Sequence, residues 1–121
     1  ECTSPDDYLL VAAEAPEIPV YARRRFAAGQ GTVALGRYAS DAEQRRAMAR
    51  LASQSVPVIL ANAARFETEF LKVYPLLAKH VAEHYREAGT IVADGWRLLV
   101  FVEKTRQPLR TDPHLGLPCF Q

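Results

Sequence analysis

Two histidines and a glutamate stand at the spacing of a known zinc-binding pattern. His80, Glu83 and His84 read H-x-x-E-H, as in one class of zinc proteases. Two histidines one helical turn apart can bind one metal ion, but a catalytic zinc needs a third protein ligand and groups that orient the ligands. Only one acid, Glu87, follows on the next turn, and the enzymes of this class have much longer chains. We therefore expect no metal site and expect both histidines to flank the solvent-exposed face of a helix.

A run of three arginines, Arg23, Arg24 and Arg25, precedes a glycine-containing turn at residues 29–31. Guanidinium groups bind phosphate through paired hydrogen bonds, so the run is the candidate binding site for an anion or a lipid headgroup. The glycines match neither a P-loop nor a complete dinucleotide-binding motif. Arginines near the C-terminus of a helix are also stabilised by the helix dipole alone. A solvated helix end is therefore the favoured interpretation, and the binding patch is the alternative.

The two cysteines stand almost at the two ends of the chain. A bond between Cys2 and Cys119 would tie the ends together and, in the disputed chain-entropy model, would stabilise the fold by about 4–5 kcal/mol. Such a bond requires an oxidising compartment, and two unrelated thiols are the alternative. Ser53, Ser55 and His114 form no recognisable nucleophile elbow. We therefore assign no catalytic residue, metal ligand or cofactor to this chain.

Short apolar runs predict the strands of a sheet. Continuous runs of this kind fit strands that are buried on both faces. The strands are expected near residues 8–13, 56–61, 90–93 and 96–103, with a further possible strand at 32–35. Pro57 has to lie at the start of its strand or on an edge. Asp94 and Gly95, between two apolar runs, are a strong signal for a β-hairpin.

One helix is predicted by its cap. Ser40 and Glu43 form a capping box, and the helix continues to Leu51 with Ala47 and Met48 on the same apolar face as Leu51.

A longer helix is expected from about residue 65 to 86. Its apolar residues recur at intervals of three and four: Phe66, Phe70, Val73, Leu76, Leu77, Val81 and Tyr85. Pro75 should kink or split this helix, and Gly89 should close it. An earlier helix, between residues 14 and 25, has to start late and stay short because of Pro16 and Pro19.

Strands that alternate with helices and end in a hairpin predict an α/β fold. We expect a layered sheet of about four to five strands, βαβαβ-like with right-handed crossovers and a C-terminal antiparallel hairpin, with helices packed on the sheet. The 121 residues, 49% of them hydrophobic, suit a single domain. Residues 104–121, rich in proline and polar side chains, are expected to form an extended tail.

The charge and the ends of the chain narrow the class of protein. The formal net charge is +1, so no strong field attracts nucleic acid or an anionic membrane. No apolar run approaches the roughly 20 residues that span a bilayer, and the acidic, polar start is no signal peptide. The chain also begins without methionine, so we expect a processed chain or a domain of a longer protein.

Short segments along nearly the whole chain resemble those of one known protein family. They are residues 2–11, 15–18, 24–29, 44–46, 55–60, 74–76, 84–85 and 117–120. They resemble the region just after the last membrane helix of bacterial polytopic glycosyltransferases. These enzymes are similar to dolichyl-phosphate-mannose protein mannosyltransferases and to lipid-linked aminoarabinose transferases. None of the matching segments is a catalytic signature.

The resemblance implies an accessory role. In that superfamily the acid that activates the acceptor lies in an extracytoplasmic loop near the first membrane helices, which this chain lacks, and the C-terminal α/β domain faces the periplasm. The partners implied are the membrane-embedded part of the same polypeptide and a lipid-linked sugar or acceptor, not nucleic acid. A periplasmic location at the inner membrane would also fit a bond between Cys2 and Cys119. The alternative is a free-standing α/β ligand-binding or protein-interaction module.

Overall fold

A mixed sheet forms the centre of the computed structural model, which describes residues 2–31, 33–93 and 95–121. In chain order the elements are β1 (Tyr8–Ala12), α1 (Glu17–Ala22), β2 (Arg25–Phe26), the 3₁₀ turn η1 (Ala27–Gly29), α2 (Asp41–Ser53), β3 (Val58–Asn62), the 3₁₀ turn η2 (Ala63–Arg65), the π-helical turn η3 (Phe66–Phe70), α3 (Leu71–Val73), α4 (Pro75–His84), β4 (Tyr85–Ala93), β5 (Trp96–Glu103), β6 (Arg110–Thr111) and β7 (Pro118–Cys119). These elements confirm the predicted α/β fold.

The five strands of the main sheet lie in the order β2-β1-β3-β5-β4. β1 is parallel to both β2 and β3, whereas β5 is antiparallel to β3 and β4. Pro57 immediately precedes β3, as its missing N–H requires. The predicted hairpin is present, because Ala93 pairs with Trp96. Asp94, one half of its predicted turn, lies outside the described residues.

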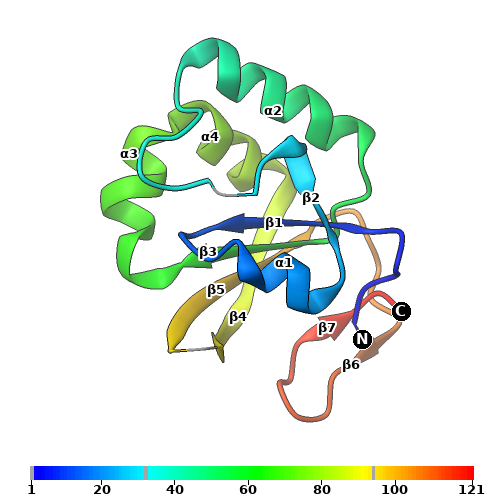
Figure 1. Ribbon diagram of the computed structural model, residues 1–121. Helices are drawn as coiled ribbons and strands as arrows, with labels where there is room; N and C mark the ends of the chain where they lie inside the picture. The colour runs from blue at the N-terminus through cyan, green and yellow to red at the C-terminus, as the bar shows by residue number, and fades with distance from the viewer. Residues whose placement is uncertain (1, 32, 94) are drawn as a thin grey trace.

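Both faces of the sheet are covered, which explains the continuous apolar runs. Neighbouring residues of a strand point to opposite faces, so Leu10 and Ile59 are buried against α2 and α4 while Leu60 is buried on the other face. Figure 1 shows α2, α3 and α4 on one side of the sheet and α1 with the small β6–β7 sheet on the other. Ile18 of α1 and Leu117 belong to this second apolar cluster.

The predicted capping box starts α2. Ser40 Oγ accepts a hydrogen bond from the Glu43 backbone N–H at 3.2 Å and donates one to Glu43 Oε1 at 2.8 Å. A buried polar residue, Gln44, also lies on the inner face of this helix. Its side-chain oxygen accepts hydrogen bonds from the backbone N–H groups of Leu76 at 2.9 Å and Leu77 at 3.1 Å. Gln44 thus satisfies N-terminal donors of α4 that have no partner within that helix.

The long helix predicted for residues 65–86 is divided in the structure, and the predicted position of its end was wrong. Pro75 splits it as expected, since it is the first residue of α4. The helix ends at His84, and Tyr85 already pairs with Glu103 as the first residue of β4. Gly89 lies at a register shift inside this strand instead of closing a helix. Pairing with β5 overrides the helical period of the apolar residues, because tertiary contacts outweigh local preference.

The possible strand at residues 32–35 is also absent from the described residues. Thr32 lies outside them, and Val33 and Ala34 are buried without forming a strand. Leu35 adopts a left-handed conformation, with φ of 56°, that no strand accommodates. The edge position beside β1 belongs to β2.

The C-terminal segment returns to the start of the chain. β6 and β7 pair in antiparallel fashion, and the backbone N–H of Phe120 donates a 2.7 Å hydrogen bond to the carbonyl oxygen of Cys2. The two ends of the chain therefore lie side by side (Figure 1). Among the described residues, no helix combines the length and apolar character that crossing a membrane requires.

Candidate functional site

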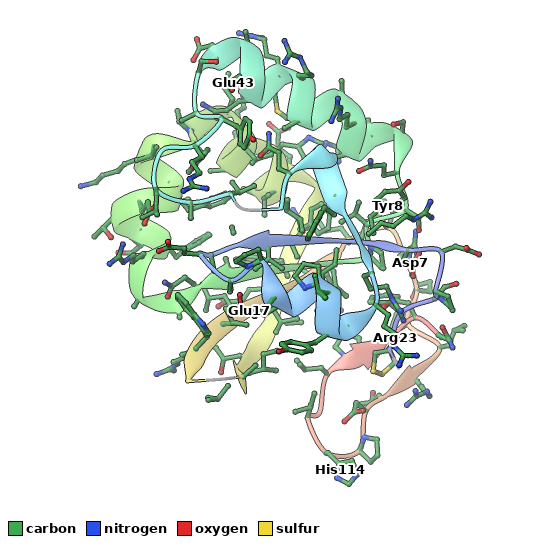
Figure 2. The ribbon with its side chains drawn as sticks, viewed as in Figure 1. Asp7, Tyr8, Glu17, Arg23, Glu43 and His114 are labelled. Carbon is green, nitrogen blue, oxygen red and sulfur yellow. A yellow bond between two sulfur atoms is a disulfide. The ribbon has the colours of Figure 1, made fainter. Side chains whose placement is uncertain are left out.

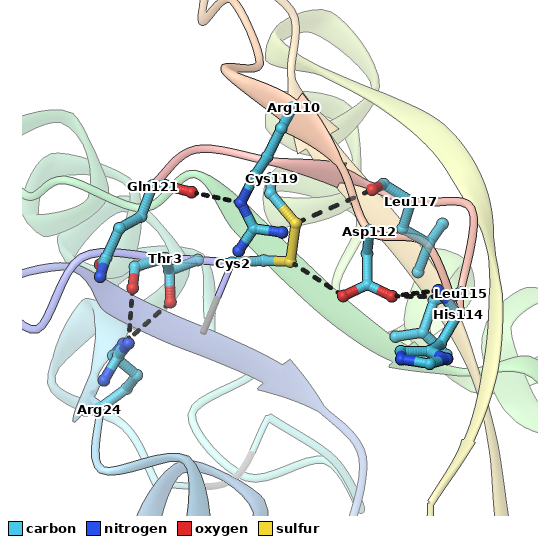
Figure 3. Close-up of a disulfide and its surroundings, with 10 residues drawn as sticks. All are labelled: Cys2, Thr3, Arg24, Arg110, Asp112, His114, Leu115, Leu117, Cys119 and Gln121. Carbon is cyan, nitrogen blue, oxygen red and sulfur yellow. Dashed lines mark hydrogen bonds between the residues drawn. A yellow bond between two sulfur atoms is a disulfide. The ribbon is translucent and has the colours of Figure 1, made fainter.

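A disulfide joins the two ends of the chain, as proposed from the sequence. Cys2 is bonded to Cys119 across a sequence separation of 117 residues. Asp112 shapes the adjacent turn, because its Oδ1 accepts hydrogen bonds from the backbone N–H groups of His114 at 2.9 Å and Leu115 at 2.8 Å (Figure 3). These bonds, with that of Leu115 the stronger, hold the pKa of Asp112 below its ordinary value. The turn and the disulfide together close the C-terminal segment onto residue 2.

The H-x-x-E-H histidines lie side by side on α4. The centroids of the His80 and His84 rings are 4.5 Å apart; His84 is exposed and His80 is half-buried. Burial, and then the neighbouring His84, lower the pKa of His80. Within the described part of the chain, the one group of three potential metal ligands is Cys2, Asp112 and Cys119, whose sulfur atoms are already bonded to each other.

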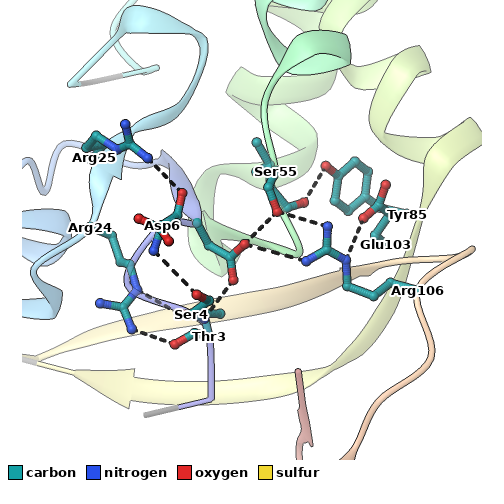
Figure 4. Close-up of polar contacts among 11 residues, drawn as sticks. Thr3, Ser4, Asp6, Arg24, Arg25, Ser55, Tyr85, Glu103 and Arg106 are labelled. Carbon is teal, nitrogen blue, oxygen red and sulfur yellow. Dashed lines mark hydrogen bonds and ion pairs between the residues drawn. The ribbon is translucent and has the colours of Figure 1, made fainter. Parts of the chain in front are cut away.

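The three arginines of the predicted binding patch point to different partners. Arg24 donates to Thr3 twice, to Oγ1 at 2.9 Å and to the carbonyl oxygen at 2.6 Å. Arg25 donates to the carbonyl oxygen of Asp6 at 2.8 Å (Figure 4) and packs 4.2 Å from the centre of the Tyr8 ring.

The third arginine of the run has a different environment. Arg23 is exposed and ends α1 in a left-handed conformation, at the end of the molecule that carries the disulfide (Figure 2). Arg24 and Arg25 therefore fasten the N-terminal segment, whereas the Arg23 side chain makes no hydrogen bond or ion pair within the described residues.

A buried acid lies at the same end of the sheet. Asp7, directly before β1, accepts hydrogen bonds from Ser55 Oγ at 2.5 Å and from the backbone N–H of Ser4 at 2.7 Å. Arg106 lies 3.5 Å from Asp7 Oδ1, donates to Ser55 Oγ at 2.9 Å and pairs with Glu103 at 3.2 Å (Figure 4). Every charged member has an opposite charge beside it, as buried charges require. We interpret this cluster as structural, because it holds the start of β1 against the end of β5.

The opposite end of the sheet contains a crevice. β1 and β3 are parallel, and the chain leaves β1 toward β2 on one side before returning to β3 on the other. In open α/β sheets, ligands bind outside the carboxyl ends of the strands at such a switch point. A cavity of about 100 Å³ lies there. Its lining residues are Ala12, Ala13, Glu14, Val33, Ala34, Leu35, Asn62, Arg65, Glu69, Phe70, Tyr74 and Trp96.

Two residues from the helical side of the sheet, Glu69 and Tyr74, hold the loop at residues 33–37 over this crevice. Glu69, in η3, accepts a hydrogen bond from the backbone N–H of Leu35 and lies 3.7 Å from Arg65. Tyr74 donates a 2.8 Å hydrogen bond to the carbonyl oxygen of Arg37. Burial, and then the charge of Glu69, raise the pKa of Tyr74 to about 12, so its hydroxyl remains a donor. π-Helical turns and left-handed non-glycine residues such as Leu35 are both frequent at functional sites.

The mouth of the crevice presents both donors and acceptors. Glu14 is exposed and Trp96 half-buried, while Asn62 uses its side-chain oxygen to accept from the backbone N–H of Ala64 at 3.1 Å. The amide nitrogen of Asn62 and the carboxylate of Glu14 have no partner among the described residues. None of these residues was proposed from the sequence, although Glu14 and Asn62 directly follow predicted strands and the switch-point rule would have indicated both.

No protein-family model, curated protein or solved structure matches this chain. No residue role is therefore transferred to it from another protein.

Proposed function

We propose that this chain is an accessory, extracytoplasmic domain of a membrane glycosyltransferase that uses a lipid-linked sugar donor, and that alone it transfers nothing. The membrane-embedded part of the same polypeptide would supply the catalytic acid. The proposal takes its substrate class from the resemblance along the chain.

The observation that carries the proposal is the bond between Cys2 and Cys119. Disulfides form and persist in oxidising compartments such as the periplasm and are rare in reducing ones. The bonded cysteines belong to the first and last segments of the resemblance, residues 2–11 and 117–120. An extracytoplasmic domain accounts for both facts.

The decisive test is the reading frame that contains residues 1–121. We expect it to encode many apolar spans directly upstream of Glu1, and we expect its product in the inner-membrane fraction with this domain accessible to protease from the periplasmic side. A complete short reading frame that begins here, or a product protected from periplasmic protease, would contradict the proposal.

Arg23 provides a test of the domain's contribution in that full-length enzyme. Reversing Arg24 or Arg25 would also break their bonds to Thr3 and Asp6, whereas the Arg23 side chain has no bond to break among the described residues. If the arginine run guides an anionic headgroup, Arg23→Glu should lower turnover several-fold with an unchanged amount of enzyme in the membrane. Arg97→Glu, an exposed arginine on β5, is the control. Unchanged turnover in both variants would leave the domain a structural or assembly role.

The crevice favours a second candidate, a free-standing ligand-binding module. Its position at the switch point is a feature of a small-molecule site, and so are the Glu14 carboxylate and the Asn62 amide nitrogen, which have no partner in the part of the chain that the structure describes. A short, complete reading frame together with ligand-dependent NMR shifts at Glu14 and Asn62 would support this candidate instead of the first.

A further inference from the structure

A second hollow lies between α2 and the glycine-containing turn that the sequence singled out. It has a volume of about 210 Å³. Its lining residues are Ala28, Gly29, Gln30, Tyr38, Glu43, Arg46, Ala47 and Arg50. The arginines next to the turn are therefore those of α2, and not the run at residues 23–25.

Arg50 is packed closely over the turn. A Cβ atom built on Gly29 would lie 1.8 Å from Arg50 Nη1, and the φ of Gly29 is +71°. Glycine is thus required at this position both by the left-handed backbone and by the approach of the guanidinium group. The Arg50 side chain rests against the backbone instead of extending freely into water.

The guanidinium groups of the hollow have no anionic partner in the described ranges. Arg46 and Arg50 are exposed, and neither guanidinium makes a hydrogen bond or ion pair with any residue that the structure describes. They are four residues apart on one helix, a spacing at which like charges repel and destabilise the helix. The one acid of the hollow, Glu43, accepts the hydroxyl hydrogen of Ser40. A bound anion would offset the repulsion between the positive charges of Arg46 and Arg50.

One backbone N–H group of the turn already donates to a side-chain oxygen. The backbone N–H of Ala28 donates a 2.8 Å hydrogen bond to Gln54 Oε1, and Ala28 has a left-handed φ of 58°. The backbone N–H of Gln30 also donates within the protein, to the carbonyl oxygen of Ala27 at 3.2 Å, so the turn forms a wall of the hollow and the donors for an anion come from the arginines. Tyr38, which is 51% exposed, adds a hydroxyl donor on the rim.

We propose that Arg46 and Arg50 form a binding site for a phosphate group, with Tyr38 and the turn at residues 28–30 as its walls. Two guanidinium groups match the planar pairs of phosphate oxygens. The shared chemistry is that of free phosphate and of a lipid phosphate headgroup. The site goes beyond the proposed function, because it would exist equally in a free-standing module.

The test is an NMR titration of the ¹⁵N-labelled chain with inorganic phosphate at low ionic strength. We expect saturable shifts of the Gly29, Gln30 and Tyr38 amides and a dissociation constant in the millimolar range. Arg46→Gln and Arg50→Gln should each weaken binding about tenfold, as expected for loss of a hydrogen bond to a charged group. Arg45→Gln is the matched control, since Arg45 is an exposed arginine of the same helix that does not line the hollow.

A second arm distinguishes the sources of the phosphate. Dihexanoyl phosphatidic acid below its micelle concentration is compared with inorganic phosphate, both at constant ionic strength. Equal affinities identify the oxyanion itself as the ligand, and tighter binding of the lipid identifies a lipid headgroup. Absence of saturable shifts with both ligands would overturn the proposal. So would an Arg45→Gln variant that loses as much affinity as Arg46→Gln, or Arg46→Gln and Arg50→Gln variants that bind like the natural chain. None of these outcomes depends on the cellular location of the chain, so the site and the transferase proposal fail separately.

Discussion

The hydroxyl group of Tyr85 donates a 2.7 Å hydrogen bond to the backbone carbonyl oxygen of Val56. Both residues are buried. The bond joins the first residue of β4 to the segment that leads into β3, two elements that are not neighbours in the sheet. Burial raises the pKa of Tyr85 above its ordinary value, so the hydroxyl keeps its proton and remains a donor.

Replacing Tyr85 by phenylalanine should therefore destabilise the fold. Tyr85→Phe keeps the ring but leaves the buried carbonyl oxygen of Val56 without a donor, which costs about 1–3 kcal/mol of unfolding free energy. The measurement is urea denaturation followed by fluorescence or circular dichroism. Tyr21→Phe is the control, because Tyr21 is 79% exposed and should change nothing measurable. Equal stabilities of the two variants would contradict the prediction.

Tyr85 also shows why the end of the long helix was not predictable. It lies four residues after Val81, and both are buried, so the apolar period continues through the point at which the chain changes from helix to strand. A helix and a buried strand can place the same side chain in the core, and periodicity does not separate them. The deciding contact is the pairing of Tyr85 with Glu103, which lies in a distant part of the sequence.

The elements with local signals were predicted well. The Ser40–Glu43 cap, the break at Pro75 and the hairpin before Trp96 each depend on residues close together in the chain. The loop over the crevice has no such signal. Its position depends on the bond between Glu69 and the Leu35 N–H, 34 residues apart.

Gln44 is the buried polar residue that holds α2 against α4, so its removal should be costly. Gln44→Leu keeps a similar volume but leaves the N–H groups of Leu76 and Leu77 without their acceptor. Two unsatisfied donors, that of Leu77 buried and that of Leu76 half-buried, should lower the unfolding free energy by about 2 kcal/mol or more. Gln107→Leu, at an exposed position, is the matched control in the same denaturation experiment. A Gln44→Leu protein as stable as the control would show that water replaces the side chain.

The disulfide should stabilise the chain in isolation. It closes a loop of 117 residues in sequence separation, and loss of a native disulfide typically costs about 2–5 kcal/mol. The Cys2→Ser, Cys119→Ser double variant should therefore unfold at lower urea concentration than the oxidised protein. The natural chain treated with reductant should match the double variant. Mass spectrometry of natively purified protein should show no alkylation before reduction. Two freely alkylated thiols would contradict a Cys2–Cys119 disulfide in the mature protein.

His80 should make stability fall at mildly acidic pH. Burial, and then the charge of His84, lower its pKa in the folded state below the ordinary value of 6.5, while Glu83 opposes them weakly. In the pH range between 6.5 and that lower value, the unfolded chain binds more protons at this position than the folded chain. The contribution to stability is therefore complete above pH 6.5 and is lost as the pH falls through the folded-state pKa.

The measurement compares the natural chain with His80→Gln by urea denaturation at several pH values between about 7.5 and 5. The carboxylates are present in both proteins, so their titration largely cancels in the difference between the two unfolding free energies. That difference should move against the natural chain as the pH falls, because only the natural chain has an imidazole that resists protonation when folded. A difference that is constant, or that moves in favour of the natural chain, would mean that His80 is not penalised for its charge. His80 would then be solvated. A cation shared by the two rings would instead add to the loss of stability on acidification, because it binds only neutral imidazole. Titration with zinc at pH 7.5 therefore separates burial from metal binding: a rise in the unfolding midpoint that His80→Gln abolishes would revive the metal interpretation of the H-x-x-E-H pattern.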